Sequence, residues 1–345
     1  MSAESYTWLL LVLLPLWHIL PAVAKVVNDR PIIGILTQPL SLGLQDKVLG
    51  HHAPQSTYIA ASYVKFVESA GARVVPLHFD APDEELRMQF RQINGILFPG
   101  GGTKLTDYYH NRFRQAAQLL WGLALNATAA GDYFPIHGTC LGFQLVTIMA
   151  AFDDSVLCEY CYQTFGLPLP LVFTASAGSS KLLSDIPGAL MKALATQNLT
   201  ENSHHDGIAP EMFHKNENLR DFFDVLSTNV DPRGGRQFVS TIEARSFPIT
   251  ATQWHPEKNN FEWGSSGQLG YDAIPHSADA VLVSQYVANH FVNQARQNFH
   301  RFVTQAAEAE ALIYNYDPVQ VPGGWFAQIY VWKHGYPPAG KPVVI

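Results

Sequence analysis

The chain has 345 residues, enough for one large domain or two ordinary ones, and its 47% apolar against 15% charged residues exclude a disordered or fibrous protein. The net charge of −7 argues against a nucleic-acid partner, since nucleic-acid binders usually carry a basic stripe. Three cysteines are too few for a disulfide scaffold, and their odd number leaves at least one thiol free or paired with another chain.

The N-terminus has the pattern of an export signal. Residues 8–17 are almost wholly apolar, but the run is shorter than the roughly 20 residues of a membrane span, and Pro15 interrupts it. The Ala-Val-Ala triplet that ends at Ala24 resembles a cleavage site. We therefore expect residues 1–24 to be a cleaved signal peptide and the mature protein to have no membrane partner; a retained anchor or a buried helix is the alternative.

Two Asn-x-Ser/Thr triplets follow, at Asn126 and Asn198. In a secreted chain such triplets are expected glycosylation sites and indicate surface loops or helix ends, although they also arise by chance.

Strand and helix patterns alternate through the first half of the chain. Short apolar runs predict strands, and apolar residues at helical spacing predict the helices between them. We expect strands over residues 32–36, 73–77, 95–98 and 134–137, and helices over residues 58–70, 82–90, 107–124 and 144–150. This alternation predicts an α/β protein with a mostly parallel sheet covered by helices on both faces.

The second half of the chain is less regular. We expect one or two strands within residues 156–174, strands over 238–245 and 249–254, and helices over 187–194 and 278–297. No long polar linker separates domains. The prediction is one catalytic domain over residues 25–318 and a C-terminal extension of unknown role over residues 319–345.

The chemistry centres on Cys140. A predicted strand runs into Gly138-x-Cys140-x-Gly142 and then into a helix, which is the nucleophile-elbow pattern with cysteine in place of serine. Both glycines remove side chains that would collide across the tight turn. Helix N-terminal N–H groups favour a thiolate and lower the pKa of the cysteine. A buried structural cysteine in a glycine-bounded loop is the alternative.

A second motif supplies a base. His255 follows a predicted strand of the same sheet and can act on Cys140 as general base, and Glu257, two residues on, can orient the imidazole. A hydrogen-bonded structural histidine is the commoner role for a lone His.

A third motif, Pro99-Gly100-Gly101-Gly102, follows another predicted strand. Backbone N–H groups of Gly101 and Gly102, with that of Leu141, are candidates for an oxyanion hole. A phosphate-binding loop is disfavoured because no Gly-Lys-Ser/Thr follows, and a plain glycine-rich turn remains the alternative.

Taken in order, Pro-Gly-Gly-Gly, Gly-Thr-Cys-Leu-Gly-Phe-Gln and Trp-His-Pro-Glu resemble the class I glutamine amidotransferase-like superfamily, which has a flavodoxin-like three-layer fold. Within it the chain resembles the γ-glutamyl hydrolase family, of peptidase C26 type. The segments that carry this closer resemblance are residues 31–39, 58–65 and 255–263, and the resemblance covers roughly residues 31–318.

The resemblance implies a cysteine hydrolase that cleaves γ-glutamyl bonds in folate and antifolate poly-γ-glutamates through a thioester on Cys140. His255 would be the base and Glu257 an assisting residue. It also implies no metal or organic cofactor, a secreted and lysosomal location, activity at acid pH, and a homodimer. Acid activity is compatible with this mechanism if Cys140 and His255 form a thiolate–imidazolium pair.

The substrate tail carries several carboxylates, so its site should contain cations or helix N-termini. Lys104, His204 and His205 are candidates, and His204 falls in an Asn-x-His segment that the family places along the substrate groove. A polar loop is the alternative, and a metal site is disfavoured because adjacent histidines rarely bind one ion. Cys158 and Cys161 are expected to form a local disulfide or to remain two quiet thiols.

Two other functions remain open. The chain could be a glutaminase or amidotransferase subunit that feeds ammonia to a partner synthetase, which the export signal argues against. It could also be an inactive secreted ligand-binding relative, but such a protein would usually lose the nucleophile or the base, and both are present.

Overall fold

The computed structural model describes residues 27–41, 43, 48–49, 56–263 and 273–333. The predicted signal peptide lies outside the described residues, as does the end of the predicted C-terminal extension. In the part of the chain that is described, no helix is long and apolar enough to cross a membrane.

The centre of the molecule is an eight-stranded sheet in the order β4-β1-β5-β6-β12-β11-β10-β8. The strands are β1 (Ile32–Leu36), β4 (Arg73–Leu77), β5 (Gly95–Phe98), β6 (Ile136–Thr139), β8 (Val172–Phe173), β10 (Phe223–Val230), β11 (Gln237–Ala244) and β12 (Ile249–Thr252). The five from β4 to β12 are parallel, and β11, β10 and β8 continue the sheet antiparallel. The parallel strands are buried along almost their whole length, as expected where helices cover both faces.

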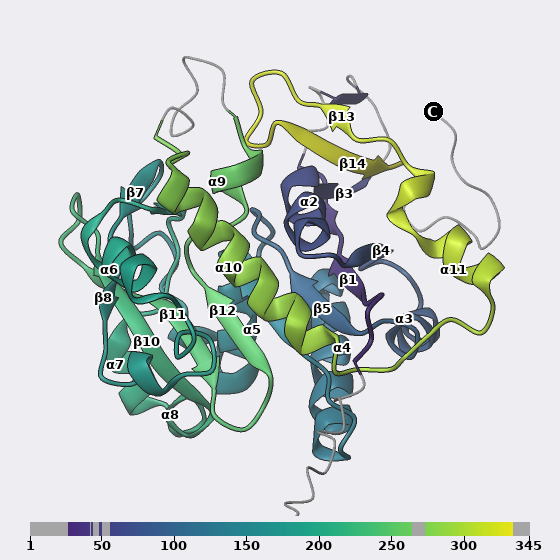
Figure 1. Ribbon diagram of the computed structural model, residues 1–345, viewed down its shortest axis with the longest axis horizontal. Coiled ribbons are helices and arrows are strands. Elements are labelled where there is room, and N and C mark those ends of the chain that lie inside the picture. The colour runs from purple at the N-terminus through teal and green to yellow at the C-terminus, as the bar shows by residue number, and fades with distance from the viewer. Residues whose placement is uncertain (1–26, 42, 44–47, 50–55, 264–272, 334–345) are drawn as a thin grey trace, which may run out of the picture.

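Helices cover both faces of this sheet (Figure 1). One layer holds α2 (Ala61–Ser69), α6 (Gly188–Thr196), α9 (Lys258–Phe261) and α10 (Ala278–Ala295), and the other holds α3 (Asp83–Phe90), α4 (Arg112–Ala129), α5 (Leu141–Ala151), α7 (Pro210–Lys215) and α8 (Glu217–Phe222). Each layer packs on the sheet through its own buried apolar cluster. The predicted α/β architecture, with a mostly parallel sheet between helical layers, is therefore confirmed.

A smaller sheet in the order β13-β14-β3-β2 brings the C-terminal part of the chain onto the domain. Its strands are β2 (Gln38–Pro39), β3 (Thr57–Ala60), β13 (Val319–Gln320) and β14 (Gln328–Trp332), and α11 (Gln305–Ala311) precedes them. Ile329 and Trp332 on β14 are buried. The first residues of the predicted extension are thus packed against the domain, while the boundary at residue 318 and the role of residues 319–345 stay predictions.

Three predicted helices have clearly different bounds in the structure. The helix expected over residues 144–150 is α5, which begins at Leu141 because the turn at Cys140 leads directly into it. The helix expected over residues 58–70 begins at Ala61, because the residues before it form β3, which pairs with β14. The helix expected over residues 107–124 runs over Arg112–Ala129, because the Asn111 side chain caps it by accepting from the N–H of Arg114.

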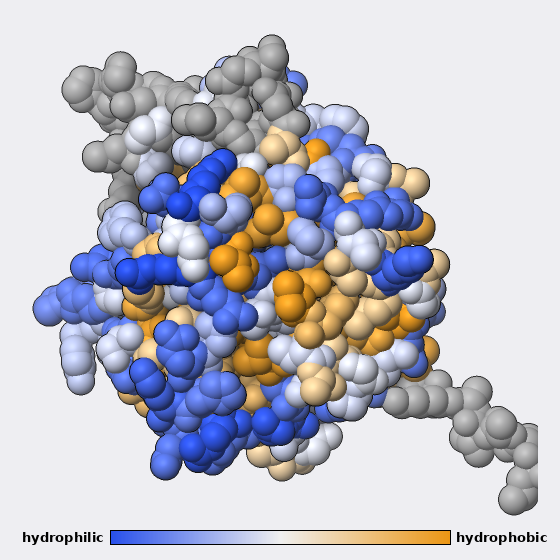
Figure 2. Space-filling view, turned by 90° about the vertical axis from the view of Figure 1, so that its left-hand side faces the viewer, coloured by the Kyte–Doolittle hydropathy of each residue, from blue (hydrophilic) through white to orange (hydrophobic). Residues whose placement is uncertain are grey.

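Figure 2 shows the side of the molecule on which β7 (Leu167–Leu169) and β8 lie in Figure 1. Apolar side chains gather on this face among hydrophilic ones. Val172 on β8 and Val230 at the end of β10 are both exposed. Because β8 is the edge strand, an apolar surface lies where the central sheet ends.

Candidate active site

Three loops meet at the carboxyl ends of neighbouring parallel strands. Cys140 follows β6, and the two strands paired with β6 are β5, which precedes Gly100, and β12, which precedes His255. Parallel neighbours end at the same edge of the sheet, where α/β proteins place their ligand sites. The three sequence motifs are therefore brought together by strand order.

Cys140 occupies a strained elbow between β6 and α5. Its φ of 52° and ψ of −103° lie in a region that non-glycine residues rarely adopt. A Cβ on Gly138 would lie 2.6 Å from the carbonyl oxygen of Gly142, and a Cβ on Gly142 would lie 1.9 Å from that of Phe98. Both glycines are therefore required by close backbone approach, which confirms the geometry expected of the motif.

His255 and Glu257 form a buried pair. Nδ1 of His255 lies 2.7 Å from Oε1 of Glu257. When Glu257 is ionised it can only accept, so Nδ1 then carries the proton and the lone pair lies on Nε2. Burial raises the pKa of Glu257 to about 7. Nε2 is buried and has no hydrogen-bond partner among the described residues. The pair therefore fixes the tautomer that a general base needs.

Gly100 shows how closely the nucleophile and the base approach each other. A Cβ built on Gly100 would lie 2.8 Å from Cε1 of His255 and 3.1 Å from Cβ of Cys140. The imidazole and the elbow therefore flank the same point of the glycine loop, and any side chain there would collide with both.

Two residues that sequence reasoning missed hold the glycine loop. The hydroxyl of Tyr63, on α2, accepts from the N–H of Gly100 at 2.8 Å and lies 3.3 Å from Nδ1 of His255. The side-chain amide of Gln38 donates to the carbonyl of Gly100 at 2.9 Å. A lone Tyr and a lone Gln carry no sequence signal, because only the fold brings α2 and β2 to this loop.

Because Tyr63 accepts from Gly100, that N–H is engaged in the protein itself. The predicted oxyanion donors are the next two residues of the loop, Gly101 and Gly102, together with Leu141 at the start of α5. Burial raises the pKa of the Cys140 thiol, and the hydrogen bond from the N–H of Leu141 to its sulfur acts in the opposite direction. The oxyanion hole itself stays a prediction.

Burial dominates the ionisation of the catalytic pair. It raises the pKa of Cys140 to about 12 and lowers the pKa of His255 to about 3. The structure therefore favours a neutral thiol beside a neutral imidazole. Burial therefore acts against the thiolate–imidazolium pair, whereas the N–H groups of the α5 N-terminus act in its favour, and the pair stays a condition of the expected acid activity.

A buried cation lies beside the pair, and sequence reasoning missed it as well. Nζ of Lys258 lies 3.3 Å from Oε2 of Glu201, with the two side chains 7% and 1% exposed. Glu257 and Glu262 are also buried, and their charges raise the pKa of Lys258. The ammonium of Lys258 thus compensates the charge of a cluster of carboxylates next to Cys140.

The predicted substrate-binding residues lie in different settings. His204 is buried, its Nδ1 is 2.8 Å from the carbonyl of Asp206, and its Nε2 has no partner within the described residues. Burial lowers the pKa of His204 to about 3. Lys104 and His205 are exposed, and the role of Lys104 in substrate binding stays a prediction.

The segment that carries His204 passes directly over the nucleophile. The carbonyl of Ser203 lies 4.0 Å from Sγ of Cys140, and the side chain of Gln144 on α5 donates to the carbonyl of Asp206 at 2.9 Å. The segment therefore forms a wall of the site beside the nucleophile.

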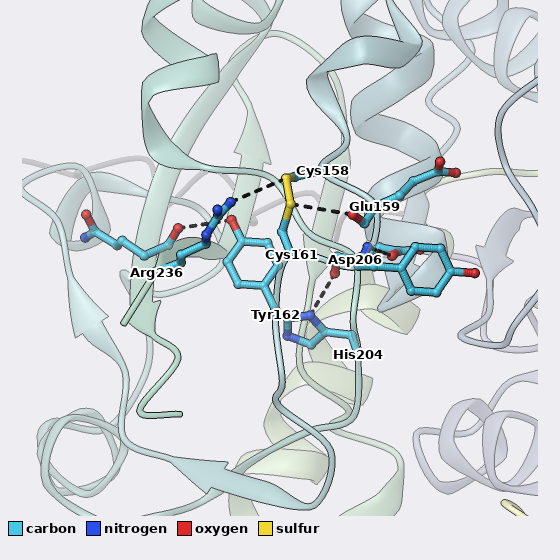
Figure 3. Close-up of a disulfide and its surroundings, with 9 residues drawn as sticks. Cys158, Glu159, Cys161, Tyr162, His204, Asp206 and Arg236 are labelled. Carbon is cyan, nitrogen blue, oxygen red and sulfur yellow. Dashed lines mark hydrogen bonds between the residues drawn. A yellow bond between two sulfur atoms is a disulfide. The ribbon is translucent and has the colours of Figure 1, made fainter. Parts of the chain in front are cut away.

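Cys158 and Cys161 form a disulfide beside this wall (Figure 3). Cys158 exchanges backbone hydrogen bonds with Gly207, and the N–H of Tyr160 donates to the Asp206 carboxylate at 2.7 Å. Of the two states expected from the sequence, the local disulfide is present, and its loop supports the His204 segment. Cys140 is the remaining, free cysteine.

The predicted glycosylation residues are exposed: Asn126 lies in the last turns of α4, and Asn198 lies between α6 and β9 (Thr200–Asn202). In the described part of the chain, no group of three or more His, Cys, Asp or Glu side chains could hold a metal ion.

Comparison with known proteins gives consistent matches. The model of the peptidase C26 family matches residues 31–257. Gamma-glutamyl hydrolase B of Dictyostelium discoideum is 40% identical over 292 residues, which are 85% of this chain and 80% of that protein. The gamma-glutamyl hydrolase of Homo sapiens is 38% identical over 304 residues, which are 88% of this chain and 90% of that protein. Among solved structures, the glutaminase domain of Trypanosoma brucei CTPS with bound acivicin has 15% identity and a TM-score of 0.46, covering 78% of this chain and 95% of that one.

Proposed function

This chain belongs to the peptidase C26 family, and from that premise we propose that it is a hydrolase that cleaves γ-glutamyl bonds in poly-γ-glutamates of folates and antifolates. The observation that carries the proposal is a buried triad: a strained cysteine elbow and a histidine lie beside the same glycine, and Nδ1 of that histidine is 2.7 Å from a glutamate. The family and the geometry of the site both support cleavage of a γ-glutamyl bond. That the substrate carries a folyl group is the more specific part of the proposal.

The reaction begins from neutral partners. Nε2 of His255 takes the thiol proton as Sγ of Cys140 attacks the γ-carbonyl, so charge separates only as the new S–C bond forms. Backbone N–H groups of the glycine loop and of Leu141 stabilise the oxyanion. Glu257 stabilises the imidazolium that forms and keeps its orientation.

The second half returns the enzyme to its starting state. The imidazolium donates its proton to the leaving amine, the C–N bond breaks, and a thioester remains on Cys140. Water, deprotonated by His255, then attacks the thioester, which releases the shortened acid and restores the thiol. His204 faces the substrate from the wall beside the nucleophile, and its buried Nε2 has no partner in the described residues. Lys104 offers a cation for the carboxylates of the substrate.

We also propose that the protein is exported, with residues 1–24 removed, glycosylated at Asn126 and Asn198, and active as a homodimer in the lysosome and outside the cell. The exposure of both asparagines and the apolar edge at β8 support these proposals.

Product analysis tests the proposal. Purified mature protein is incubated at pH 5 with pteroyl-penta-γ-glutamate, with an α-linked analogue and with glutamine, beside Cys140→Ala. Shortened folates from the γ-linked substrate with wild type alone are the expected result. Ammonia from glutamine with intact polyglutamate would show the glutaminase alternative, and no product from any substrate would show an inactive binding relative.

A further inference from the structure

Lys258, the first residue of α9, is a buried lysine beside the catalytic pair. Its ammonium lies 3.3 Å from Glu201 on β9, a strand of a different, smaller sheet. A buried ion pair persists only where further contacts compensate the loss of hydration. The surroundings of Glu201 therefore indicate what the pair holds together.

Glu201 is joined to both sides of the site. Its backbone carbonyl accepts from the N–H of His255 at 2.9 Å. Its Oε1 accepts from the hydroxyl of Ser203, and the carbonyl of Ser203 is the atom 4.0 Å from the Cys140 sulfur. One residue thus contacts the base through its backbone and the wall over the nucleophile through its side chain.

We propose that Lys258 and Glu201 form a positioning ion pair that holds the His255 loop against the Ser203 wall, and that their opposed charges set the pH range in which Cys140 and His255 react. The proposal rests on the proposed function, in which those two residues carry the chemistry. Neither member of the pair needs to touch the substrate.

The two charges act on the catalytic pair with opposite signs. Lys258 lowers the pKa of both Cys140 and His255, whereas Glu201 raises the pKa of both. Burial has the largest effect on both pKa values, and in the wild type Glu201 opposes part of the effect of Lys258. Loss of the Glu201 charge would leave Lys258 less opposed, so both pKa values would fall together.

Other ionisable groups also face this cluster, and they stay in place when Glu201 changes. They come from α2, from the loop after β12, from the end of α9 and from the wall segment, and they are Tyr63, Glu257, Glu262 and His204. A shift of the pH profile in a variant changed only at Glu201 is therefore assigned to the loss of the Glu201 charge.

Glu201→Gln is the direct test, because it removes the charge and keeps an acceptor for Ser203. The pH profile of kcat/KM on a γ-glutamyl substrate should move to lower pH by about one unit, the order of magnitude expected for loss of a nearby charge. The direction does not depend on which ionisation gives which limb, since both pKa values fall. Lys258→Arg, which keeps the charge, should lower kcat and leave the profile in place.

Glu243→Gln is the matched control. Glu243 is also buried and accepts from the backbone N–H groups of Lys181 and Leu182, but it lies on β11 near the start of β12, away from the carboxyl end that carries the site. Its profile should superimpose on that of the wild type. An unmoved profile in Glu201→Gln, or an equal shift in Glu243→Gln, would overturn the proposal.

A second readout needs no substrate. The pH midpoint for alkylation of Cys140 by iodoacetamide, read by peptide mass spectrometry, should fall in Glu201→Gln and not in Glu243→Gln. If the wild type cleaved no γ-glutamyl bond yet this midpoint shifted as expected, the proposed function would fail and the electrostatic role of the pair would stand. Circular dichroism confirms the folding of each variant. This control matters because a change such as Lys258→Met would leave buried carboxylates without their cation.

Discussion

At the scale of single residues, close packing fixes the elbow that carries the nucleophile. Gly142→Ala would place a methyl group 1.9 Å from the carbonyl oxygen of Phe98, so β5 and α5 must separate. We expect this variant to be strongly destabilised and inactive, because overpacking against backbone cannot relax by rotating a side chain.

Gly122→Ala is its control. Gly122 lies inside α4 with nothing within 4 Å of the added Cβ, and alanine there should raise stability by about 0.5–1 kcal/mol. Thermal unfolding of both variants checks the prediction, which fails if Gly142→Ala melts near the wild-type temperature.

The three catalytic side chains should differ in importance. Cys140→Ala removes the nucleophile and should abolish hydrolysis while folding normally. His255→Asn should lose most activity because an asparagine amide has no basic nitrogen to accept the thiol proton. Glu257→Ala should lose less, because it acts through the imidazole. Steady-state kinetics measure the order, and equal losses at His255 and Glu257 would contradict it.

Tyr63 should matter through one hydroxyl. Tyr63→Phe leaves the buried N–H of Gly100 without its acceptor, which costs about 1–3 kcal/mol, and it loosens the glycine loop beside His255. We expect kcat to fall about tenfold, equivalent to about 1.4 kcal/mol, with little change in KM. Tyr58→Phe is the control, because Tyr58 is also buried but packs on Phe326 of the C-terminal segment. Equal kinetics in the two variants would contradict the role of the hydroxyl.

At the scale of elements, the disulfide loop supports the wall over the nucleophile. Replacing Cys158 and Cys161 together by serine should lower stability by about 2 kcal/mol, as chain entropy gives for so short a loop. For a protein of this size that is a fall in Tm of about 3–4 °C. KM should rise, because the loop holds the segment of His204 by backbone hydrogen bonds.

Reduction of the wild-type protein tests the same loop without a substitution, because it breaks the bond between Cys158 and Cys161. Dithiothreitol should reproduce the Tm and KM of the double serine variant. Identical values before and after reduction would show that the loop keeps its structure without the bond.

Some strands and helices could be predicted from the sequence with their observed bounds, and others could not. Strands such as β1 and β5 were predicted with their observed bounds because buried apolar runs bounded by Pro, Gly or Asn leave little choice. The start of α2 was wrong because β3 forms by pairing with β2 and with β14, and β14 is more than 250 residues away in the chain. Strand β10 was not predicted, since its polar residues pair within the sheet rather than alternating with apolar ones.

The catalytic motifs were predictable because the chemistry needs particular residue types next to glycines and strand ends. Tyr63, Lys258 and Glu201 were not, because each is an ordinary residue that becomes functional only through contacts between elements distant in sequence. The sequence also shows only part of what sets the pKa of Cys140: the helix terminus that lowers it is visible there, whereas the burial that raises it is not.

At the scale of the whole molecule, buried histidines predict a loss of stability in acid. Burial lowers the folded-state pKa of five of them well below 6.5; they are His78, His137, His204, His255 and His290. Between the folded and unfolded pKa values the unfolded chain binds more protons, so their contribution to stability is lost as pH falls from about 6.5 toward 4.

Three glutamates act in the opposite direction. Burial raises the pKa of Glu68, Glu257 and Glu262, so their contribution is present at low pH and is lost as pH rises through the raised value. Five histidines lower the stability in acid and only three glutamates raise it. We therefore expect Tm to fall on the order of 5 °C between pH 7 and pH 5. Calorimetry at the two pH values measures it, and a Tm that rises in acid would contradict the balance.

The central claim is that Cys140 forms a covalent intermediate during hydrolysis of a γ-glutamyl bond. The most direct measurement is to mix enzyme with excess pteroyl-poly-γ-glutamate, quench with acid within milliseconds, and map the protein by mass spectrometry. We predict a pteroylglutamyl adduct on the peptide that contains Cys140, its disappearance as substrate is exhausted, and neither adduct nor product with Cys140→Ala. Full turnover by Cys140→Ala, with no adduct on the wild type, would contradict the mechanism.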